Sequence, residues 1–348
     1  MLLTNSSHSP RSSKGHAKSN AKHVMPHRGQ LRLRRVAFSM SNAIGDSLVC
    51  MVIVHNLIAS GVDVSVFGGP AHQLAAWFPS AHILPLPHDS LIEETFARFD
   101  AVFQMHHEQP VSRLLERHHH VITLHNVEYG NQEGCMGERF AQYCRDELGI
   151  NNATRRNGMT APNGLVHRRH ANRVIIHPEA STGEKRWLRT RFIEVAATLK
   201  ARGFEVVFII APHERERWDD LLHWGIVAPN IHDLDKLAGY VYESGWFIGN
   251  DSGIGHLASS LGIPSVIVFR RRNVSEKWRP AWGDIEVVLP WQWMPSAYLK
   301  EKWWRETLTC ARVLAGFDAI VRRHIQLSRQ AERSLDRRPK AYARLRAT

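Results

Sequence analysis

The sequence of 348 residues contains few cysteines and no spacing that would join them into a known motif. Its four cysteines are Cys50, Cys135, Cys144 and Cys310, and none belongs to a CxxC or zinc-finger pattern. Four thiols spread over a chain of this length do not form a disulfide framework. Reduced thiols are therefore expected, which favours a cytoplasmic protein.

Long apolar runs are also lacking. No stretch approaches the roughly 20 residues that an apolar helix needs to span a bilayer. The N-terminal segment carries cations but no continuous apolar stretch, so it does not resemble a secretory signal. The sequence thus predicts a soluble protein.

Acidic residues are scarce at both ends of the chain. Residues 1–35 hold eight Lys or Arg and no acid, and residues 322–348 carry a net charge of +7, whereas the whole chain carries +12. Residues 36–321 therefore sum to −3, which argues against a basic groove that binds nucleic acid. Tails of this kind either contact anionic inner-membrane lipids peripherally, at roughly 1 kcal/mol per well-placed cation, or are simply solvated.

Alternating β-rich and helical segments indicate two α/β domains with doubly wound parallel sheets. A long helix is expected near the C-terminus, at Ser296–Ala315. The polar stretch 151–170 lacks a helical or strand period and is interpreted as a linker. The predicted organisation is a disordered basic tail (1–34), a first Rossmann-like domain (35–150), the linker (151–170), a second Rossmann-like domain (171–305) and a C-terminal helix with a basic tail (306–348).

Two loops that follow predicted strands carry candidate functional residues. In SNAIGDSLV, Asp46 follows a turn at Gly45, where it is either a plain helix cap or a carboxylate that accepts a proton from a substrate hydroxyl. In HPEASTGEKRW, Ser181, Thr182 and Lys185 offer hydroxyls and a cation that suit a phosphate, although an ordinary capped loop would look similar.

A third loop, GNDSGIGH, leads from a strand into a helix whose free N–H groups would face an anion. Its candidates are Asp251, Ser252, Gly253 and His256, and the simpler interpretation is a capped helix with a packed histidine. Glu214 follows another strand, where an acidic side chain typically accepts from ribose hydroxyls, but a surface glutamate is equally ordinary there.

Taken in order, these motifs resemble the bacterial heptosyltransferases of glycosyltransferase family nine. The resemblance runs from about Arg35 to Phe269, and NDSGIGHLASSLGIPSVIVF is its most specific part. It implies a GT-B fold, which consists of two facing Rossmann-like domains and a C-terminal helix that returns to the first domain. It also implies an inverting glycosyltransferase of lipopolysaccharide core biosynthesis that moves heptose from ADP-heptose to a glycolipid acceptor.

The resemblance also assigns roles to the candidate residues. Asp46 becomes the catalytic base. The donor phosphates are contacted by Ser181 and Lys185, with Thr182 beside them, and the ribose is contacted by Glu214. Asp251, Ser252, Gly253 and His256 then line the pocket for the diphosphate and sugar. No cofactor and no metal ion are expected, because no DxD-type pair of carboxylates stands where a metal-bridged diphosphate would need one.

Two segments depart from the family pattern. Gln104-Met105-His106-His107 stands where an Asp-x-Gln-Gly pattern is usual, and RRRNVSEKWRPAWG (270–283) replaces a short Gly/Pro loop. Two alternatives therefore stay open. The first is transfer of another nucleotide sugar to a different surface glycan, and the second is an inactive transferase fold that binds an anionic ligand.

Overall fold

The computed structural model describes residues 33–130, 132–291 and 296–336. The predicted N-terminal basic tail therefore lies almost wholly outside the described residues, as do the last twelve residues of the C-terminal tail.

The first five strands form one parallel sheet in the order β3-β2-β1-β4-β5. They are β1 (Arg35–Ser39), β2 (Asp63–Phe67), β3 (His82–Leu84), β4 (Ala101–Gln104) and β5 (Val121–Thr123). β1 lies at the centre, and its residues from Val36 to Ser39 are fully buried. Val36 and Phe38 belong to one hydrophobic cluster and Ala37 to another, so helices cover both faces of this sheet.

Helices and short turns connect these strands. They are α1 (Ile44–Ala59), α2 (Gly69–Gln73), η1 (Ala75–Trp77), η2 (Asp89–Leu91), α3 (Ile92–Phe96), α4 (Leu114–Arg117), α5 (His125–Tyr129) and α6 (Met136–Asp146). α1 and α6 pack together on the Val36 face, whereas α3 and α4 supply the cluster on the Ala37 face.

The second sheet is also parallel and has the order β10-β9-β8-β6-β7. Its strands are β6 (His170–His177), β7 (Glu205–Phe208), β8 (Ser244–Asn250), β9 (Ser265–Val268) and β10 (Ile285–Val288). Each strand overlaps one of the short β-rich runs of the sequence. The two sheets confirm the predicted α/β class with two Rossmann-like sheets.

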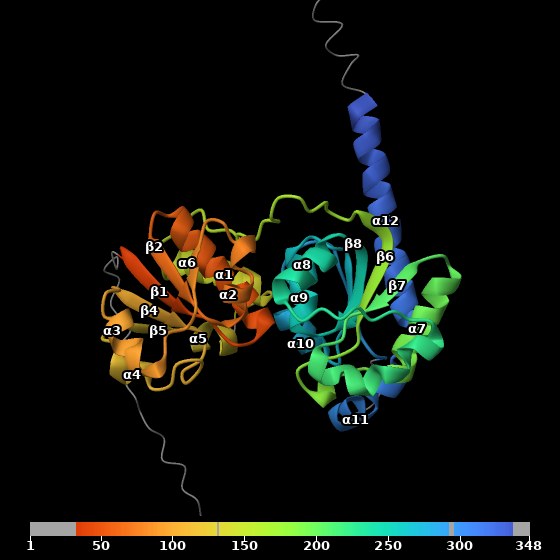
Figure 1. Cartoon of the computed structure of the whole chain (residues 1–348), viewed down its shortest axis with the longest axis horizontal. Helices are drawn as coiled ribbons and strands as arrows, with labels where there is room; N and C mark the ends of the chain where they lie inside the picture. The colour runs from red at the N-terminus through yellow and green to blue at the C-terminus, as the bar shows by residue number, and fades with distance from the viewer. Residues whose placement is uncertain (1–32, 131, 292–295, 337–348) are drawn as a thin grey trace, which may run out of the picture. The chain divides into compact units, whose positions relative to one another are not determined.

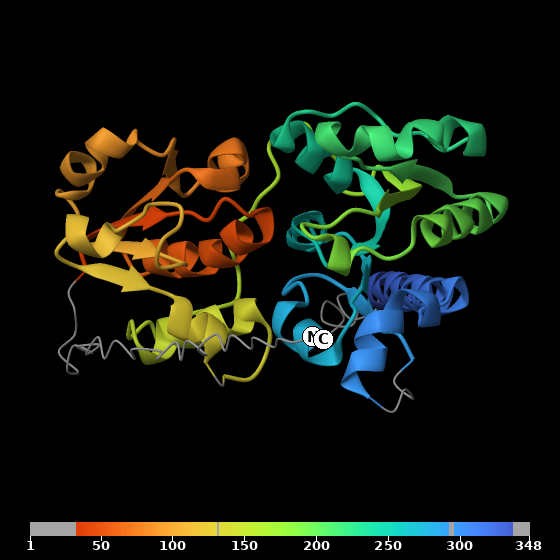
Figure 2. The ribbon, with the colours of Figure 1, turned by 90° about the horizontal axis from the view of Figure 1, so that it is seen from below.

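Helices cover both faces of the second sheet (Figure 1). The helical segments of this half are η3 (Gly183–Lys185), α7 (Arg189–Ala201), η4 (Pro212–Trp224), α8 (Leu234–Tyr242), α9 (Gly253–Ser260), α10 (Arg272–Trp278), α11 (Ala297–Thr307) and α12 (Cys310–Asp336). α8 and α9 lie on one face, with Ile175 of β6 in their cluster. α7 and α12 lie side by side on the other, with Val174 and Ile176 (Figures 1 and 2).

The predicted single helix Ser296–Ala315 is wrong, because the chain breaks it into α11 and α12. Leu308 is extended and fully buried against the second sheet, and Thr309 Oγ1 accepts a hydrogen bond from the Arg312 backbone N–H at 3.3 Å. A buried extended residue followed by a Thr cap ends one helix and starts the next.

Within the described residues, the C-terminal helix packs mainly on the second sheet, whereas the prediction placed it against the first domain. α12 packs on β10, β9 and α7, because Val313, Phe317 and Ile320 place an apolar stripe on the second sheet. Where exactly the domains and linker begin and end stays a prediction.

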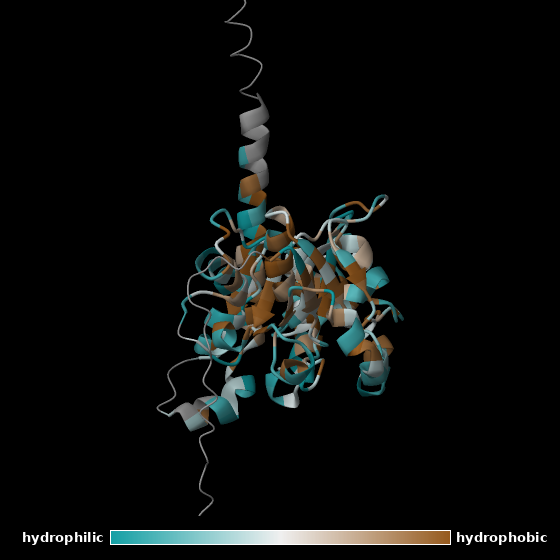
Figure 3. Ribbon diagram, turned by 90° about the vertical axis from the view of Figure 1, so that its left-hand side faces the viewer, coloured by the Kyte–Doolittle hydropathy of each residue, from teal (hydrophilic) through white to brown (hydrophobic). Residues whose placement is uncertain are grey.

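Hydrophobic residues concentrate in the strands and on the inner faces of the helices (Figure 3). Within the described ranges, no helix combines the length and the apolar character that crossing a bilayer requires.

Candidate functional site

The loop after β1 places a carboxylate at the first turn of α1. The helix is preceded by Ala43, whose side chain makes no cap, so Asp46 lies inside the helix as its third residue. The Ser41 hydroxyl donates to Asp46 Oδ2 at 3.1 Å, and about a fifth of the Asp46 side chain is exposed. Asp46 is therefore a fixed, accessible carboxylate that does not cap its own helix.

His106 connects Asp46 to a second carboxylate. Its Nε2 lies 3.3 Å from Asp46 Oδ2, and its Nδ1 lies 3.5 Å from Oε2 of the buried Glu128 in α5. These two carboxylates, Asp46 first, raise the pKa of His106 from 6.5 to about 9, against the opposing effect of burial. At neutral pH the ring is an imidazolium held between two acids.

The loop after β8 leads into α9 and presents its N-terminus. Ser252 caps the helix by accepting from the Gly255 N–H at 3.4 Å. Asp251 is buried and its Oδ2 lies 3.0 Å from Nζ of Lys185, which η3 provides. The first-turn N–H groups and the lysine bring positive potential to the same place.

His256 follows in the first turn of α9. Burial lowers the pKa of this histidine, so the ring is neutral at pH 7. Its Nδ1 is buried and has no hydrogen-bond partner among the described residues. A neutral ring with one unsatisfied nitrogen can bind a ligand oxygen as donor or a ligand hydroxyl as acceptor.

Two glycines allow α1 and α9 to approach closely at their N-termini. A Cβ on Gly253 would lie 2.7 Å from Ile44 Cβ and 3.1 Å from the Gly45 nitrogen. A Cβ on Gly45 would lie 3.1 Å from Cδ2 of His256. Real Cβ atoms do not approach other atoms as closely as 2.7 Å, so the close junction of the two helices requires glycine at position 253.

These groups share one cleft of about 950 Å³. Its lining includes eight of the nine predicted site residues, namely Asp46, Ser181, Lys185, Glu214, Asp251, Ser252, Gly253 and His256. Thr182, the ninth, is exposed and is not among the lining residues. Loops that are up to 210 residues apart in sequence thus come together at the carboxyl ends of both sheets, as ligand sites of such sheets do.

Buried Glu179 organises a part of the cleft that the sequence does not reveal. It accepts from Trp218 Nε1 at 2.8 Å and pairs with Arg186 at 2.7 Å and Arg217 at 3.1 Å. Both arginines line the cleft beside Glu214. Burial, and then the charge of Glu179, raises the pKa of Glu214. In the sequence, Glu179 is visible only as the third residue of the candidate loop HPEASTGEKRW, and nothing there relates it to its partners.

α10 forms one wall of the cleft. Its Trp278 lines both the cleft and an adjoining pocket of about 180 Å³ that also includes Arg270 and Val274. The departing segment 270–283 therefore forms a wall of this pocket. Among the described residues, no group of three or more His, Cys, Asp or Glu side chains is arranged to hold a metal ion.

Sequence comparison identifies a family for the central part of the chain. The profile of glycosyltransferase family 9 (heptosyltransferase) matches residues 106–297, which is more than half of the chain. No curated protein sequence matches the chain.

Solved structures share the fold at low identity. A glycosyltransferase of family 9 from Veillonella parvula has a TM-score of 0.66 and 14% identity over 82% of this chain and 97% of its own. The ADP-heptose lipopolysaccharide heptosyltransferase II of E. coli has a TM-score of 0.62 and 15% identity over 84% and 99%. The E. coli heptosyltransferase WaaC, solved with ADP-2-deoxy-2-fluoro heptose, has a TM-score of 0.59 and 15% identity over 82% and 99%.

Proposed function

The chain belongs to glycosyltransferase family 9 and is a glycosyltransferase, and we propose that it transfers heptose from ADP-heptose to a lipopolysaccharide-core-type acceptor with inversion. One observation carries the proposal. A fixed carboxylate, Asp46, lies in the same cleft as a helix N-terminus, Lys185 and a neutral buried histidine. A base and an anion-binding surface are the two parts that transfer from a diphosphate sugar requires.

In the proposed step, Asp46 takes the proton of an acceptor hydroxyl, whose oxygen attacks the anomeric carbon of the donor sugar. The new glycosidic bond forms as the bond between that carbon and the diphosphate breaks, and ADP leaves with the bonding electron pair. Attack from the side opposite the leaving group inverts the anomeric configuration. General-base help of this kind contributes about 10²–10⁴ in rate.

The departing diphosphate gains negative charge, and the wall formed by η3 and α9 is suited to stabilise it. Lys185 and His256 line the cleft together with Gly253 and Ile254 of the first turn of α9. The Lys185–Asp251 pair holds the ammonium in place before the donor arrives. Donors fixed in advance need no reorganisation as charge develops, which is the source of their catalytic effect.

Glu214, Ser181 and the arginines held by Glu179 provide the remaining polar wall of the cleft. We assign Glu214 to the ribose hydroxyls and Ser181 to the donor phosphates. His106 acts as a positioning residue, because it contacts Asp46 and is fixed from behind by Glu128.

The positive charge at the diphosphate comes from Lys185 and α9, so we expect transfer to need no added metal ion. Enzyme treated with EDTA should then keep its rate, and loss of activity that a divalent cation restores would contradict this.

We also propose that the basic tails bring the enzyme to anionic lipid. Deletion of residues 1–30 should weaken binding to anionic vesicles, an effect that salt reduces.

A second candidate is transfer of another nucleotide sugar. The observation in its favour is the pocket beside Lys185, because Arg270, Val274 and Trp278 from the departing segment shape it. A pocket wall that differs from the family pattern would select a different sugar or base.

A donor screen distinguishes the two candidates. Binding of ADP, UDP and GDP is measured by calorimetry, and hydrolysis or transfer is then followed with ADP-heptose and with UDP- and GDP-hexoses. Preference for ADP and turnover of ADP-heptose support the first candidate, and preference for UDP or GDP supports the second.

The Asp46→Asn variant tests the mechanism in the same assay. It should bind the nucleotide with unchanged affinity and lose transfer by about 10²–10⁴. Asp219→Asn, at an exposed position of η4, is the matched control and should behave as the wild type. Transfer at the wild-type rate by Asp46→Asn would remove this carboxylate from the mechanism.

A further inference from the structure

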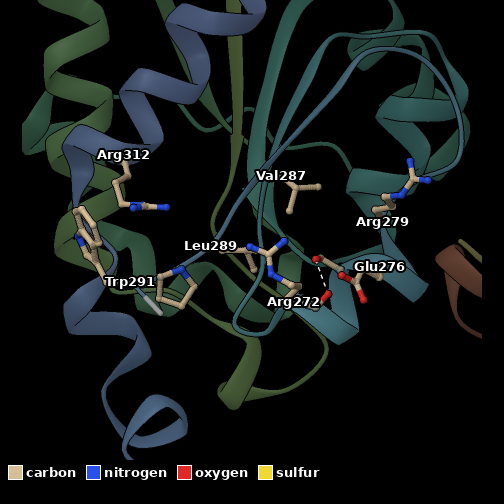
Figure 4. A pocket seen from close by; sticks show the side chains of 9 residues that line it. Arg272, Glu276, Arg279, Val287, Leu289, Trp291 and Arg312 are labelled. Carbon is tan, nitrogen blue, oxygen red and sulfur yellow. Dashed lines mark hydrogen bonds between the residues drawn. The ribbon is translucent and has the colours of Figure 1, made fainter. Parts of the chain in front are cut away.

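A second pocket, of about 510 Å³, lies between α10, β10 and α12 (Figure 4). It shares no lining residue with the cleft that holds Asp46 and Lys185. Its lining is Arg272, Ser275, Glu276, Arg279, Val287, Leu289, Pro290, Trp291 and Arg312. Three guanidinium groups against one carboxylate give it a positive character.

Two of these arginines are available to a ligand. Arg279 is paired with Glu138 at 3.2 Å, but neither Arg272 nor Arg312 forms an ion pair or a side-chain hydrogen bond within the described part of the chain. Figure 4 shows the guanidinium groups of Arg272 and Arg312 extending into the same space, whereas Arg279 lies apart from them. Arg312 and Arg272 come from different helices, α12 and α10, so the fold brings them together.

Arg312 is held by an aromatic ring, and its guanidinium has no acceptor within the part of the chain that the structure describes. Its guanidinium stacks over the Trp291 ring at 4.7 Å, and its Nε is buried without a hydrogen-bond partner among the described residues. A buried donor that remains unsatisfied is costly, and a charged acceptor would remove that cost. Planar guanidinium groups bind phosphate oxygens in pairs.

Part of the pocket lining is apolar. Val287 and Leu289 of the β10 segment, with Pro290 and Trp291, line the pocket. The volume exceeds what a bare phosphate needs, and an aromatic face with aliphatic neighbours suits the ring of a sugar.

We propose that this pocket binds a phosphomonoester carried on a sugar-sized group, at a site separate from the donor cleft. The phosphate contacts Arg272 and Arg312, and the sugar lies against Leu289 and Trp291. α10 forms the wall between the two sites. Residues Arg272, Ser275, Glu276 and Arg279, spaced as one helix face, line this pocket, while Val274 and Trp278 line the donor side.

The test is a calorimetric titration of the full-length protein saturated with ADP, so that the donor cleft is filled. The probes are inorganic phosphate and α-D-glucose 1-phosphate. The wild type should bind both, and the sugar phosphate several-fold more tightly because of the apolar wall. Absence of heat with both probes at millimolar concentration, or equal affinity for the two, would overturn the proposal.

Variants locate the binding. Arg272→Gln and Arg312→Gln should each weaken glucose 1-phosphate about tenfold or more, the loss expected for one charge-assisted contact. Arg272 is exposed, so its replacement keeps the test valid even if Arg312→Gln lowers stability. Arg322→Gln, an exposed arginine of α12, is the matched control.

Lys185→Ala separates this site from the donor cleft. It should leave glucose 1-phosphate affinity unchanged, and a loss there equal to that in Arg272→Gln would place the binding in the cleft and refute the proposal. No arm of this experiment measures transfer, so its outcome is independent of the proposed reaction.

Discussion

Removing the imidazolium between Asp46 and Glu128 should change how the stability of the protein depends on pH. The perturbation is the double variant His106→Gln/Glu128→Gln. Glutamine at position 106 can still donate to Asp46, and the second substitution avoids leaving the Glu128 carboxylate buried without a cation. The variant therefore removes the titrating pair with little change in shape.

The magnitude follows from the pKa of His106. A rise from 6.5 to about 9 corresponds to at most about 3.4 kcal/mol, at 1.36 kcal/mol per pKa unit. About a third of this side chain is exposed, so solvent screening reduces the value to about 1–2 kcal/mol. Because the folded pKa is the higher one, the stabilisation is complete below about pH 6.5 and is lost as pH rises through about 9.

Other histidines act in a different pH range. Burial lowers the pKa of His177 and of His256, so their effect is a loss of stability as pH falls below about 6.5. Burial is the largest cause that raises the pKa of Cys50 and acts in both proteins, whereas the smaller contribution of Glu128 is present in the wild type alone. The difference between the two proteins from pH 6.5 to 9.5 therefore reports on His106.

The assay is urea unfolding followed by circular dichroism at pH 6.0, 7.5 and 9.5, without added nucleotide. Between the lowest and the highest pH the wild type should lose about 1–2 kcal/mol more than the double variant. His72→Gln, at an exposed position of α2, should follow the wild type. The single variant His106→Gln should be less stable than the double variant, because it leaves Glu128 uncompensated. Parallel pH curves for the wild type and the double variant would refute the charged bridge.

Three further results are expected. Gly253→Ala should lower the free energy of unfolding by about 1–3 kcal/mol, because the new Cβ would lie 2.7 Å from Ile44 Cβ. Gly183→Ala places its Cβ in open space and should leave the free energy of unfolding unchanged. Equal urea midpoints for the two variants would contradict this. Lys185→Ala should weaken ADP binding by about 1.5–3 kcal/mol in calorimetry, and unchanged affinity would exclude the lysine from the diphosphate site. Truncation after residue 305 should lower the melting temperature sharply, because it removes α12 from the second sheet. Truncation after residue 330 should leave the melting temperature unchanged. An unchanged melting temperature after the cut at residue 305 would contradict the packing of α12.

The strands could be predicted because their apolar runs are short, β-rich and separated by turns. Each candidate loop was found for a related reason, since it follows such a run at the carboxyl end of a strand. The break between α11 and α12 was missed because Leu308 looks like any apolar helix residue. Only its burial against the second sheet makes it extended.

The contact between His106 and Glu128 could not be predicted from the sequence, for a different reason. His106 lies in the loop after β4 and Glu128 in α5, 22 residues later, so no spacing relates them. The sequence showed only that His106 stands where the family has another pattern. Glu179 was likewise visible as part of a loop, but its three partners come from residues 186, 217 and 218.

The departing segment 270–283 shows how one local change in sequence can alter two sites. As α10, it places Val274 and Trp278 in the wall of the pocket beside Lys185. Arg272, Ser275 and Glu276 lie in the wall of the second pocket, because a helix places residues three and four apart on one face. A substitution that shifts this short helix should therefore change the walls of both pockets.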